Sequence, residues 1–332
     1  MKIHGYAALQ PSTKLELFSY DAKELGPFEV LVKISHCGLC HTDLYMMENS
    51  WKRSTYPLLP GHEIVGTVVK TGPLSVRKEG ERVGISWVHS SCLSCPECLK
   101  GDTNICQKKI GIYNQGRFGG FANHVIADSR FSFLLPDLLE SKFAAPLLCA
   151  GATVYAPLIR HKIQKGQSVC VIGIGGLGHL ALQFYKAFGC VVSAISSTPS
   201  KEKEAKEFGA SHFYTFANPP KPLEFDFLLC TIDAVLDWNQ ILSFLKPNGI
   251  LCLVSRPLKG LSIDPTLLVS TQRTICGSNN ANRAVMEEML KFAALHEIRP
   301  KIEEMPLSSI NEGIQRLRSN QVRYRIVFRS LA

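Results

Sequence analysis

The sequence lacks any apolar run long enough to span a bilayer, and its first ten residues contain one lysine and no long apolar core. We therefore expect no membrane partner and no secretory signal, and we expect a cytoplasmic protein. Internal repeats and low-complexity tracts are also missing. With 45% hydrophobic and 20% charged residues, the composition is typical of a globular chain and argues against disorder.

Concentrated charge is missing as well. The formal net charge is +9, but the lysines and arginines are scattered along the chain and form no single basic stripe. A scattered positive surface favours solubility and attracts phosphorylated small molecules. We therefore do not expect a nucleic-acid partner.

Cysteine, in contrast, is abundant, with twelve residues. Without an export signal, metal ligation explains them better than a disulfide framework. Four thiolates with C-x2-C-x2-C-x7-C spacing can close a tetrahedral zinc site that has no open position and only holds a loop in shape. The alternative, buried thiols or a disulfide pair, is disfavoured by Pro96, Gly101 and the charged neighbours. These four residues are Cys92, Cys95, Cys98 and Cys106.

The length of 332 residues suits two domains. Residues 1–148 contain short apolar runs between Gly and Pro turns, which predicts a β-rich domain. From residue 149 to 280, strands alternate with helices, which predicts a parallel sheet with crossover helices. Residues 281–332 predict two helices and a final strand, with Ser309 and Glu312 as a capping box. The expected strands are 30–34, 64–69, 81–85, 168–172, 191–195, 225–230, 250–254, 274–276 and 323–328.

A glycine-rich turn follows the expected strand 168–172 and opens an amphipathic helix. In this context the G-x-G-x-x-G pattern indicates a dinucleotide site, because glycines let the backbone approach a pyrophosphate at a helix N-terminus. A purely structural turn is the alternative. The motif residues are Gly173, Gly175, Gly176, Leu177 and Gly178.

The residues after the next strand should select the cofactor. NAD sites place a carboxylate about 20 residues after the motif, but none occurs between Gly178 and Glu202. Hydroxyls and a lysine instead suit a 2′-phosphate, which favours NADP(H), although a surface loop with a helix cap would also account for them. They are Ser196, Ser197, Thr198 and Lys201.

Four further segments complete a recognisable set: CGLCHTD (37–43), PGHEIVG (60–66), PLLCAG (146–151) and VRYR (322–325). With the cysteine loop and the glycine motif, they resemble the zinc-dependent medium-chain alcohol dehydrogenases, most closely the cinnamyl alcohol dehydrogenase-like NADP(H) aldehyde reductases. The resemblance implies an α/β fold, with a Rossmann doubly wound parallel sheet in 149–280. It also implies a β-rich GroES-like catalytic domain in 1–148 completed by 281–332, and a homodimer.

The resemblance implies Cys40, His62 and Cys149 as catalytic zinc ligands, with a fourth position left open. Glu63 corresponds to a carboxylate that can approach the metal as an alternate ligand. Asp43 would accept the second ring N–H of His62 and fix its tautomer.

The resemblance also assigns residues around the ligands. Thr42 corresponds to the hydroxyl that contacts the substrate oxygen and begins a proton relay, and His41 lies at the cofactor pyrophosphate. Thr153 corresponds to a residue near the nicotinamide. Trp87 and Trp51 are candidates for the substrate pocket, with ordinary core packing as the alternative for Trp87.

The chain departs from the family at two places. Tyr45 stands where many relatives have a histidine, and its reference pKa near 10 makes it a poorer base at neutral pH. We therefore expect a relay through the cofactor ribose, or alcohol oxidation slower than aldehyde reduction. Residues 107–118 form a shorter loop than in most relatives, which predicts a more open entrance.

Together these features predict a zinc oxidoreductase that holds two zinc ions per chain and transfers a hydride between NADP(H) and a primary alcohol or aldehyde. Two alternatives remain. One is an NAD-dependent polyol or secondary-alcohol dehydrogenase, whose sites usually carry an Asp at the end of the second strand. The other is a non-catalytic nucleotide-binding redox sensor.

Overall fold

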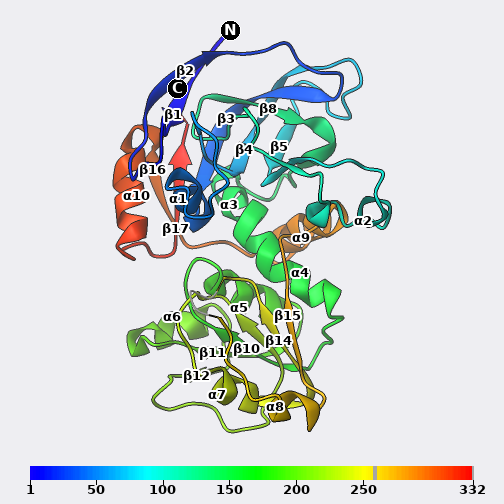
Figure 1. The fold of residues 1–332 in the computed structure, drawn as a ribbon, viewed down its shortest axis with the longest axis vertical. Helices are drawn as coiled ribbons and strands as arrows, with labels where there is room; N and C mark the ends of the chain where they lie inside the picture. The colour runs from blue at the N-terminus through cyan, green and yellow to red at the C-terminus, as the bar shows by residue number, and fades with distance from the viewer. Residues whose placement is uncertain (257–259, 331–332) are drawn as a thin grey trace. The chain divides into compact units, whose positions relative to one another are not determined.

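The computed structural model describes residues 1–256 and 260–330, and the chain divides into two compact units (Figure 1). The first unit is formed by Met1–Cys149 with Asn282–Ala332, and the second by Ala150–Ala281. The sequence analysis placed the divisions after residues 148 and 280. Residues 331–332 of the expected C-terminal segment lie outside the described residues.

A seven-stranded sheet forms the framework of the first unit, in the order β16-β17-β3-β4-β5-β9 with β8 also pairing with β3. Strand β3 is long, and its register against β4 shifts twice. On its other side it pairs with β8 near its start and with β17 near its end. The smaller pairs are β1-β2 and β6-β7. Strand bounds are β1 (Lys2–Ala7), β2 (Glu16–Asp21), β3 (Glu29–Leu39), β4 (Glu63–Thr71), β5 (Arg82–Ile85), β6 (Val88–Ser90), β7 (Ile110–Gly111), β8 (His124–Asp128), β9 (Ser132–Leu134), β16 (Ile302–Pro306) and β17 (Arg325–Arg329).

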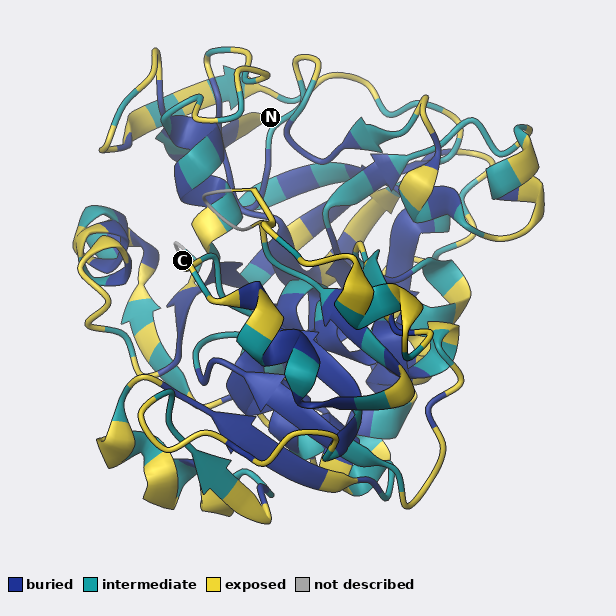
Figure 2. Cartoon of the chain, turned by 60° about the horizontal axis from the view of Figure 1, so that its bottom comes forward, coloured by how far each residue is buried: buried dark blue, intermediate teal, exposed yellow. Residues whose placement is uncertain are grey.

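The end of β3 brings distant segments together. Gly38 pairs with Glu63 at the start of β4, and Leu39 pairs with Ile326 at the start of β17. The core below is apolar and closely packed, with the rings of Phe121 and Phe328 edge to face at 5.7 Å. Figure 2 shows the buried residues concentrated in the strands, and the exposed ones in turns and connecting loops.

The second unit contains a six-stranded parallel sheet in the order β12-β11-β10-β13-β14-β15. Counted from β10, this order is 3-2-1-4-5-6, so the predicted Rossmann fold is confirmed. Its central strands are mostly apolar and buried, as expected when helices cover both faces of a parallel sheet. Their bounds are β10 (Ser168–Ile172), β11 (Val191–Ile195), β12 (His212–Tyr214), β13 (Phe225–Cys230), β14 (Leu245–Leu253) and β15 (Thr274–Gly277).

Helices connect and cover these strands. In the first unit they are α1 (His41–Met47), α2 (Pro96–Leu99), α3 (Ser141–Pro146), α9 (Arg283–Leu295) and α10 (Ile310–Arg318). In the second they are α4 (Ala152–Arg160), α5 (Gly178–Ala187), α6 (Glu202–Glu207), α7 (Trp238–Ser243) and α8 (Thr266–Val269). A π-helical turn, Leu147–Gly151, joins α3 to α4. The 3-10 turns are Thr103–Ile105, Ser129–Phe131, Pro199–Lys201 and Leu307–Ser309.

The capping box predicted for α10 is wrong. Ser309 occupies the N-cap position, but its side chain makes no capping hydrogen bond. The 3-10 turn Leu307–Ser309 runs directly into the helix and leaves Ser309 at φ −90° and ψ 20°, whereas an N-cap serine needs an extended backbone.

One helical stretch of the described chain, Ser141–Arg160, is long and apolar enough to cross a membrane, with a mean hydropathy of 1.4. This result rests on length and composition alone, and it differs in that respect from the expectation that no apolar run is long enough to span a bilayer. However, 67% of the stretch is buried inside the protein, and a core helix passes the same test.

The start of β3 is fixed by the buried carboxylate of Glu29. It accepts hydrogen bonds from the backbone N–H of Gly26 at 2.9 Å, from Lys23 at 3.0 Å and from Arg117 at 2.9 Å. Burial raises the pKa of Glu29, but these donors outweigh burial and lower it to about 2. Through Arg117, this carboxylate also anchors the short loop 107–118.

We predict that Glu29→Gln destabilises the protein at pH 7 and that the loss shrinks in acid. The folded-state pKa of Glu29 is depressed, so its contribution, up to about 3 kcal/mol, is complete above the unfolded-state pKa near 4.5 and disappears as the pH falls towards 2. Urea unfolding at pH 7, 5 and 3 measures the difference from the parent, with the exposed Glu16→Gln as control. An equal difference at all three pH values would contradict this account.

Candidate functional site

The three predicted catalytic ligands meet in the first unit. Cys40 directly follows β3 at the N-cap of α1, His62 directly precedes β4, and Cys149 lies in the π-helical turn. The Cys149 sulfur is 3.3 Å from His62 Nε2, and one ligand atom from each of Cys40, His62, Glu63 and Cys149 lies within 4.8 Å of the others. Two thiols and an imidazole at this spacing fit a tetrahedral Zn²⁺ with one position open.

Asp43 orients the histidine. Its Oδ1 lies 2.8 Å from His62 Nδ1 and accepts the backbone N–H of Gly61 at 3.0 Å. Its Oδ2 accepts the backbone N–H of Cys40 at 3.1 Å. The histidine therefore turns Nε2 towards the two thiols, which is the arrangement found when a carboxylate accepts the other ring N–H of a metal-binding histidine.

The electrostatics favour a thiolate at the site. The hydrogen bond with Cys149 lowers the pKa of Cys40 well below its usual value, and His62 lowers it further. The same hydrogen bond raises the pKa of Cys149. Burial lowers the pKa of His62, but the charge and hydrogen bond of Asp43 outweigh burial and raise it. Without a metal, the imidazole therefore carries the positive charge and a sulfur the negative charge. A bound divalent cation would take the place of the proton on the imidazole and pair with the thiolate.

Glu63 and Arg325 form a buried ion pair beside the ligands. Burial raises the pKa of Glu63 to about 7, although Arg325 opposes the shift. Glu63 Oε2 has no hydrogen-bond partner among the described residues, and a Cβ on Gly38 would lie 2.0 Å from that oxygen. Glycine is therefore required beside the carboxylate, and its free oxygen suits an alternate metal ligand. The sequence analysis assigned Arg325 no role, although it lies in the VRYR segment.

Aromatic rings enclose His62. The Trp87 ring stands edge-on at 5.8 Å, the Tyr113 ring lies at 6.1 Å, and the Tyr113 hydroxyl is 3.5 Å from Nδ1. The Arg53 guanidinium lies 4.5 Å from the Trp51 ring and 5.5 Å from the Trp87 ring. The sequence analysis missed Tyr113 and Arg53; Tyr113 lies in the short loop 107–118, whose length alone gave no signal for it.

The other residues predicted to take part in proton transfer or to contact the cofactor near the nicotinamide and pyrophosphate lie on two helices. On α1, His41 is exposed and Thr42 is half-buried, and the Tyr45 ring lies 6.3 Å from His41 and 5.3 Å from Trp51. Thr153 is half-buried on α4 in the second unit.

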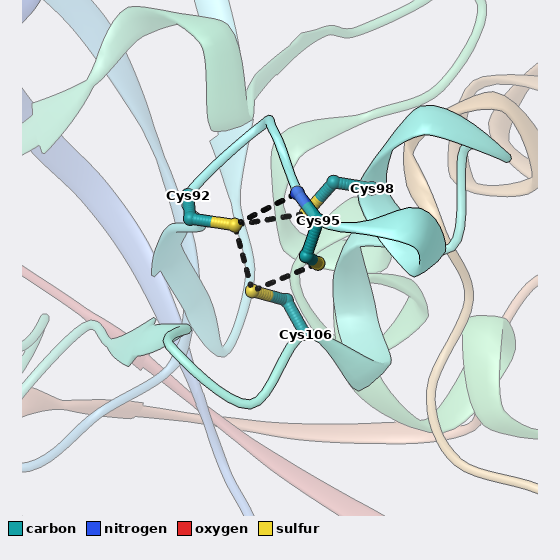
Figure 3. A group of neighbouring side chains, drawn as sticks. All are labelled: Cys92, Cys95, Cys98 and Cys106. Carbon is teal, nitrogen blue, oxygen red and sulfur yellow. Dashed lines mark hydrogen bonds between the residues drawn. The ribbon is translucent and has the colours of Figure 1, made fainter.

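The four loop cysteines converge on one point (Figure 3). Their sulfurs are separated by 3.9 Å between Cys92 and Cys98, 3.8 Å between Cys95 and Cys106, and 3.6 Å between Cys92 and Cys106. Adjacent sulfurs of a tetrahedral zinc–thiolate site lie about 3.8 Å apart, so the loop fits the ion without rearrangement. Backbone N–H groups of Ser94 and Cys95 lower the pKa of Cys92 to about 6, which favours a thiolate.

The glycine motif joins β10 to α5. Gly173 has φ +95°, and a Cβ on Gly178 would lie 1.9 Å from the Gly173 carbonyl oxygen, so both positions require glycine. A Cβ on Gly175 would meet nothing within 4 Å. The turn is therefore tight at its ends and open at Gly175, where a pyrophosphate would approach the backbone.

The four polar residues predicted to contact the cofactor after β11 differ in how exposed their side chains are. Ser196 is buried and its hydroxyl accepts the N–H of Thr198 at 3.1 Å, which gives it a role in the turn. Ser197 is exposed, and Thr198 and Lys201 are half-buried. Lys201 Nζ donates to the carbonyl oxygen of Ile174 at 2.7 Å and so brings its charge to the glycine turn.

Comparison with known proteins agrees with both units. Family models for the alcohol dehydrogenase GroES-like domain and for zinc-binding dehydrogenases match residues 26–137 and 176–294. The aldehyde reductase AdhA of Synechocystis is 38% identical over 330 residues, 98% of each chain. A cinnamyl alcohol dehydrogenase structure from Sorghum bicolor superposes with a TM-score of 0.94 at 33% identity, covering 99% of this chain and 98% of that one. One from Helicobacter pylori complexed with NADP(H) gives 0.93 at 28% identity, covering 100% and 99%. The chain therefore belongs to the cinnamyl alcohol dehydrogenase-like group of the zinc-dependent medium-chain alcohol dehydrogenases.

Proposed function

We propose that this protein is an NADP(H)-dependent aldehyde reductase or alcohol dehydrogenase for primary alcohols and their aldehydes. The convergence of Cys40, His62 and Cys149 beside Glu63 carries the proposal. The first unit is the catalytic domain and the second binds the nucleotide, and the active protein is a homodimer. The cofactors are NADP(H) and two zinc ions per chain, one in the cysteine loop and one at the catalytic ligands.

The ligand residues prepare the site for a carbonyl oxygen. Cys40, His62 and Cys149 would hold a zinc ion that would polarise this oxygen and stabilise negative charge on it, and bound NADPH would supply the hydride. Cys40 and Cys149 neutralise a divalent cation as thiolates, and His62 adds a neutral nitrogen held in place by Asp43. Arg325 pairs with one carboxylate oxygen of Glu63. The other oxygen, Oε2, has no partner among the described residues and can replace a ligand that leaves the metal.

The residues assigned to proton transfer lie on helix α1. Thr42 holds the proton at the substrate oxygen, and His41 lies one residue before it on the exposed side of the helix. Tyr45, one turn further, is a weak base at neutral pH. With bound cofactor, the relay would therefore pass through its ribose, or alcohol oxidation would be slower than aldehyde reduction.

The substrate contacts Trp87 and Trp51. Trp87 lies edge-on to the ligand His62, and both indole rings share the Arg53 guanidinium. The two indole rings favour flat aromatic aldehydes, which can stack against them. The Arg53 guanidinium favours substrates with a polar end.

The cofactor preference is for NADP(H). No carboxylate lies between the end of β11 and Glu202, and Ser197, Thr198 and Lys201 suit a 2′-phosphate. Without an acidic residue at this position, the NAD-dependent polyol dehydrogenase is disfavoured. A non-catalytic redox sensor is disfavoured by the complete ligand set.

Cys40→Ser tests the catalytic ligands. We expect the variant to lose about one zinc ion per chain and at least about 1,000-fold in kcat/KM for aldehyde reduction, because a neutral hydroxyl replaces a thiolate ligand. Elemental analysis and steady-state assays with NADPH give both numbers. The matched control is Cys37→Ala, since Cys37 belongs to the same segment but is buried outside the ligand set. Full zinc content and full activity in Cys40→Ser would refute the assignment.

Lys201→Ala tests the cofactor site. We expect kcat/KM for NADPH to fall about 10-fold, while the value for NADH changes less than about 2-fold, because only the 2′-phosphate needs the charge. The exposed Lys203→Ala on α6 is the control. Equal losses with both cofactors would show that Lys201 only supports the glycine turn, and a parent enzyme that prefers NADH would overturn the NADP(H) proposal.

A further inference from the structure

A third set of metal-ligating side chains lies in the second unit, in addition to the catalytic ligands and the cysteine loop. It consists of His161 at the end of α4, Cys252 in β14 and Cys276 in β15. One ligand atom from each lies within 4.8 Å of the others, and His161 Nε2 is 3.3 Å from the Cys276 sulfur. The sequence analysis assigned none of the three a role.

The backbone brings these side chains together. Strands β14 and β15 are parallel neighbours, and Cys252 and Cys276 are directly paired in register, so their side chains leave the same face of the sheet. The end of α4 is held at this edge strand by Arg160, whose Nη1 donates to the carbonyl oxygen of Gly277 at 3.0 Å. The arrangement is therefore held by the sheet register and a hydrogen bond, whether or not the thiols bind anything.

The spacing suits a thiophilic metal ion. In a tetrahedral zinc site, two sulfurs lie about 3.8 Å apart and a sulfur and a nitrogen about 3.6 Å apart. The separation of 3.3 Å between His161 and Cys276 is the same as that between His62 and Cys149 at the catalytic ligands. Cys252 is buried, whereas His161 and Cys276 are half-exposed, so a water can reach the fourth position.

The ligand types also suit a metal, since cysteine thiolates and an imidazole nitrogen are ligands that Zn²⁺ prefers. Two thiolates would neutralise a divalent cation beside Arg160.

A buried hydroxyl in the same part of the second unit is unsatisfied. Tyr185 is fully buried on α5, and its hydroxyl has no hydrogen-bond partner within residues 1–256 and 260–330. Its ring and that of His161 both pack on Phe227, at 6.1 Å and 5.8 Å. An orphan polar group is rare in a protein interior.

We propose that His161, Cys252 and Cys276 form a third metal site, which binds a thiophilic ion of the Zn²⁺ class with two sulfurs, one imidazole nitrogen and a water. Other buried thiols of this sheet, such as Cys170 and Cys230, lie outside any such ligand set among the residues described and serve as packing. A bound ion would join the edge of the sheet to the end of α4. It would therefore stabilise the second unit without taking part in hydride transfer.

Zinc content and thiol protection test the site in the full-length protein. After equilibration with Zn²⁺ and removal of the excess, we expect Cys276→Ser and His161→Gln each to hold about one zinc ion fewer than the parent, with unchanged kcat for aldehyde reduction. Cys190→Ala, which removes a neighbouring thiol outside the ligand set, should keep the parent's zinc content. The catalytic zinc is tested separately by Cys40→Ser, so failure of one site is distinguishable from failure of the other.

Alkylation of the parent covers the case in which a variant does not fold. With Zn²⁺ present, N-ethylmaleimide should modify Cys276 at least about 10-fold more slowly than after chelator treatment, as read by peptide mass spectrometry, while Cys190 reacts equally in both. Equal zinc contents in parent and variants would overturn the proposal. So would equal labelling of Cys276 with and without zinc, or recovery of Cys252 and Cys276 as a disulfide.

Discussion

The proposed catalytic ligand set depends on one buried carboxylate, that of Asp43. An ionised carboxylate without partners in a protein interior is strongly unfavourable, so this side chain requires its donors as much as they require it. It accepts N–H groups from Cys40 and Gly61 and contacts the His62 ring, and so joins the end of β3 to the segment before β4. Gly61 can present its N–H because its φ is +96°, which other residues rarely adopt. The Asp43 carboxylate thus fixes both the position of Cys40 and the orientation of the His62 ring.

Each charge near the ligands has an opposing charge close by. Glu63 is paired with Arg325, which comes from the last strand, and Gly38 leaves the space that the carboxylate occupies. The sheet creates this arrangement, since the end of β3 pairs with both β4 and β17. In the second unit, glycine at positions 173 and 178 likewise lets the turn close where a nucleotide phosphate would lie. In both units the backbone places the functional groups, and small residues make room for them.

The sequence predicted best the features encoded locally. Strands β10, β11 and β13 have the predicted bounds, because each is a short, mostly apolar segment next to a glycine or proline turn. The start of β14 was missed, since residues 246–249 have the composition of a turn. Arg325, Tyr113 and the His161 cluster depend on contacts between residues 51 to 262 positions apart or on sheet register, which no local pattern encodes. Dimerisation and a cytoplasmic location stay predictions.

Everything proposed for the first unit requires that Cys40, His62 and Cys149 share one metal ion. An anomalous difference map, recorded on both sides of the zinc absorption edge from crystals grown with Zn²⁺ and NADPH, tests this directly. We predict a zinc peak bonded to both sulfurs and to Nε2 of His62, at distances of about 2.3 Å and 2.1 Å. A map with a peak in the cysteine loop but none among these three side chains would contradict the account.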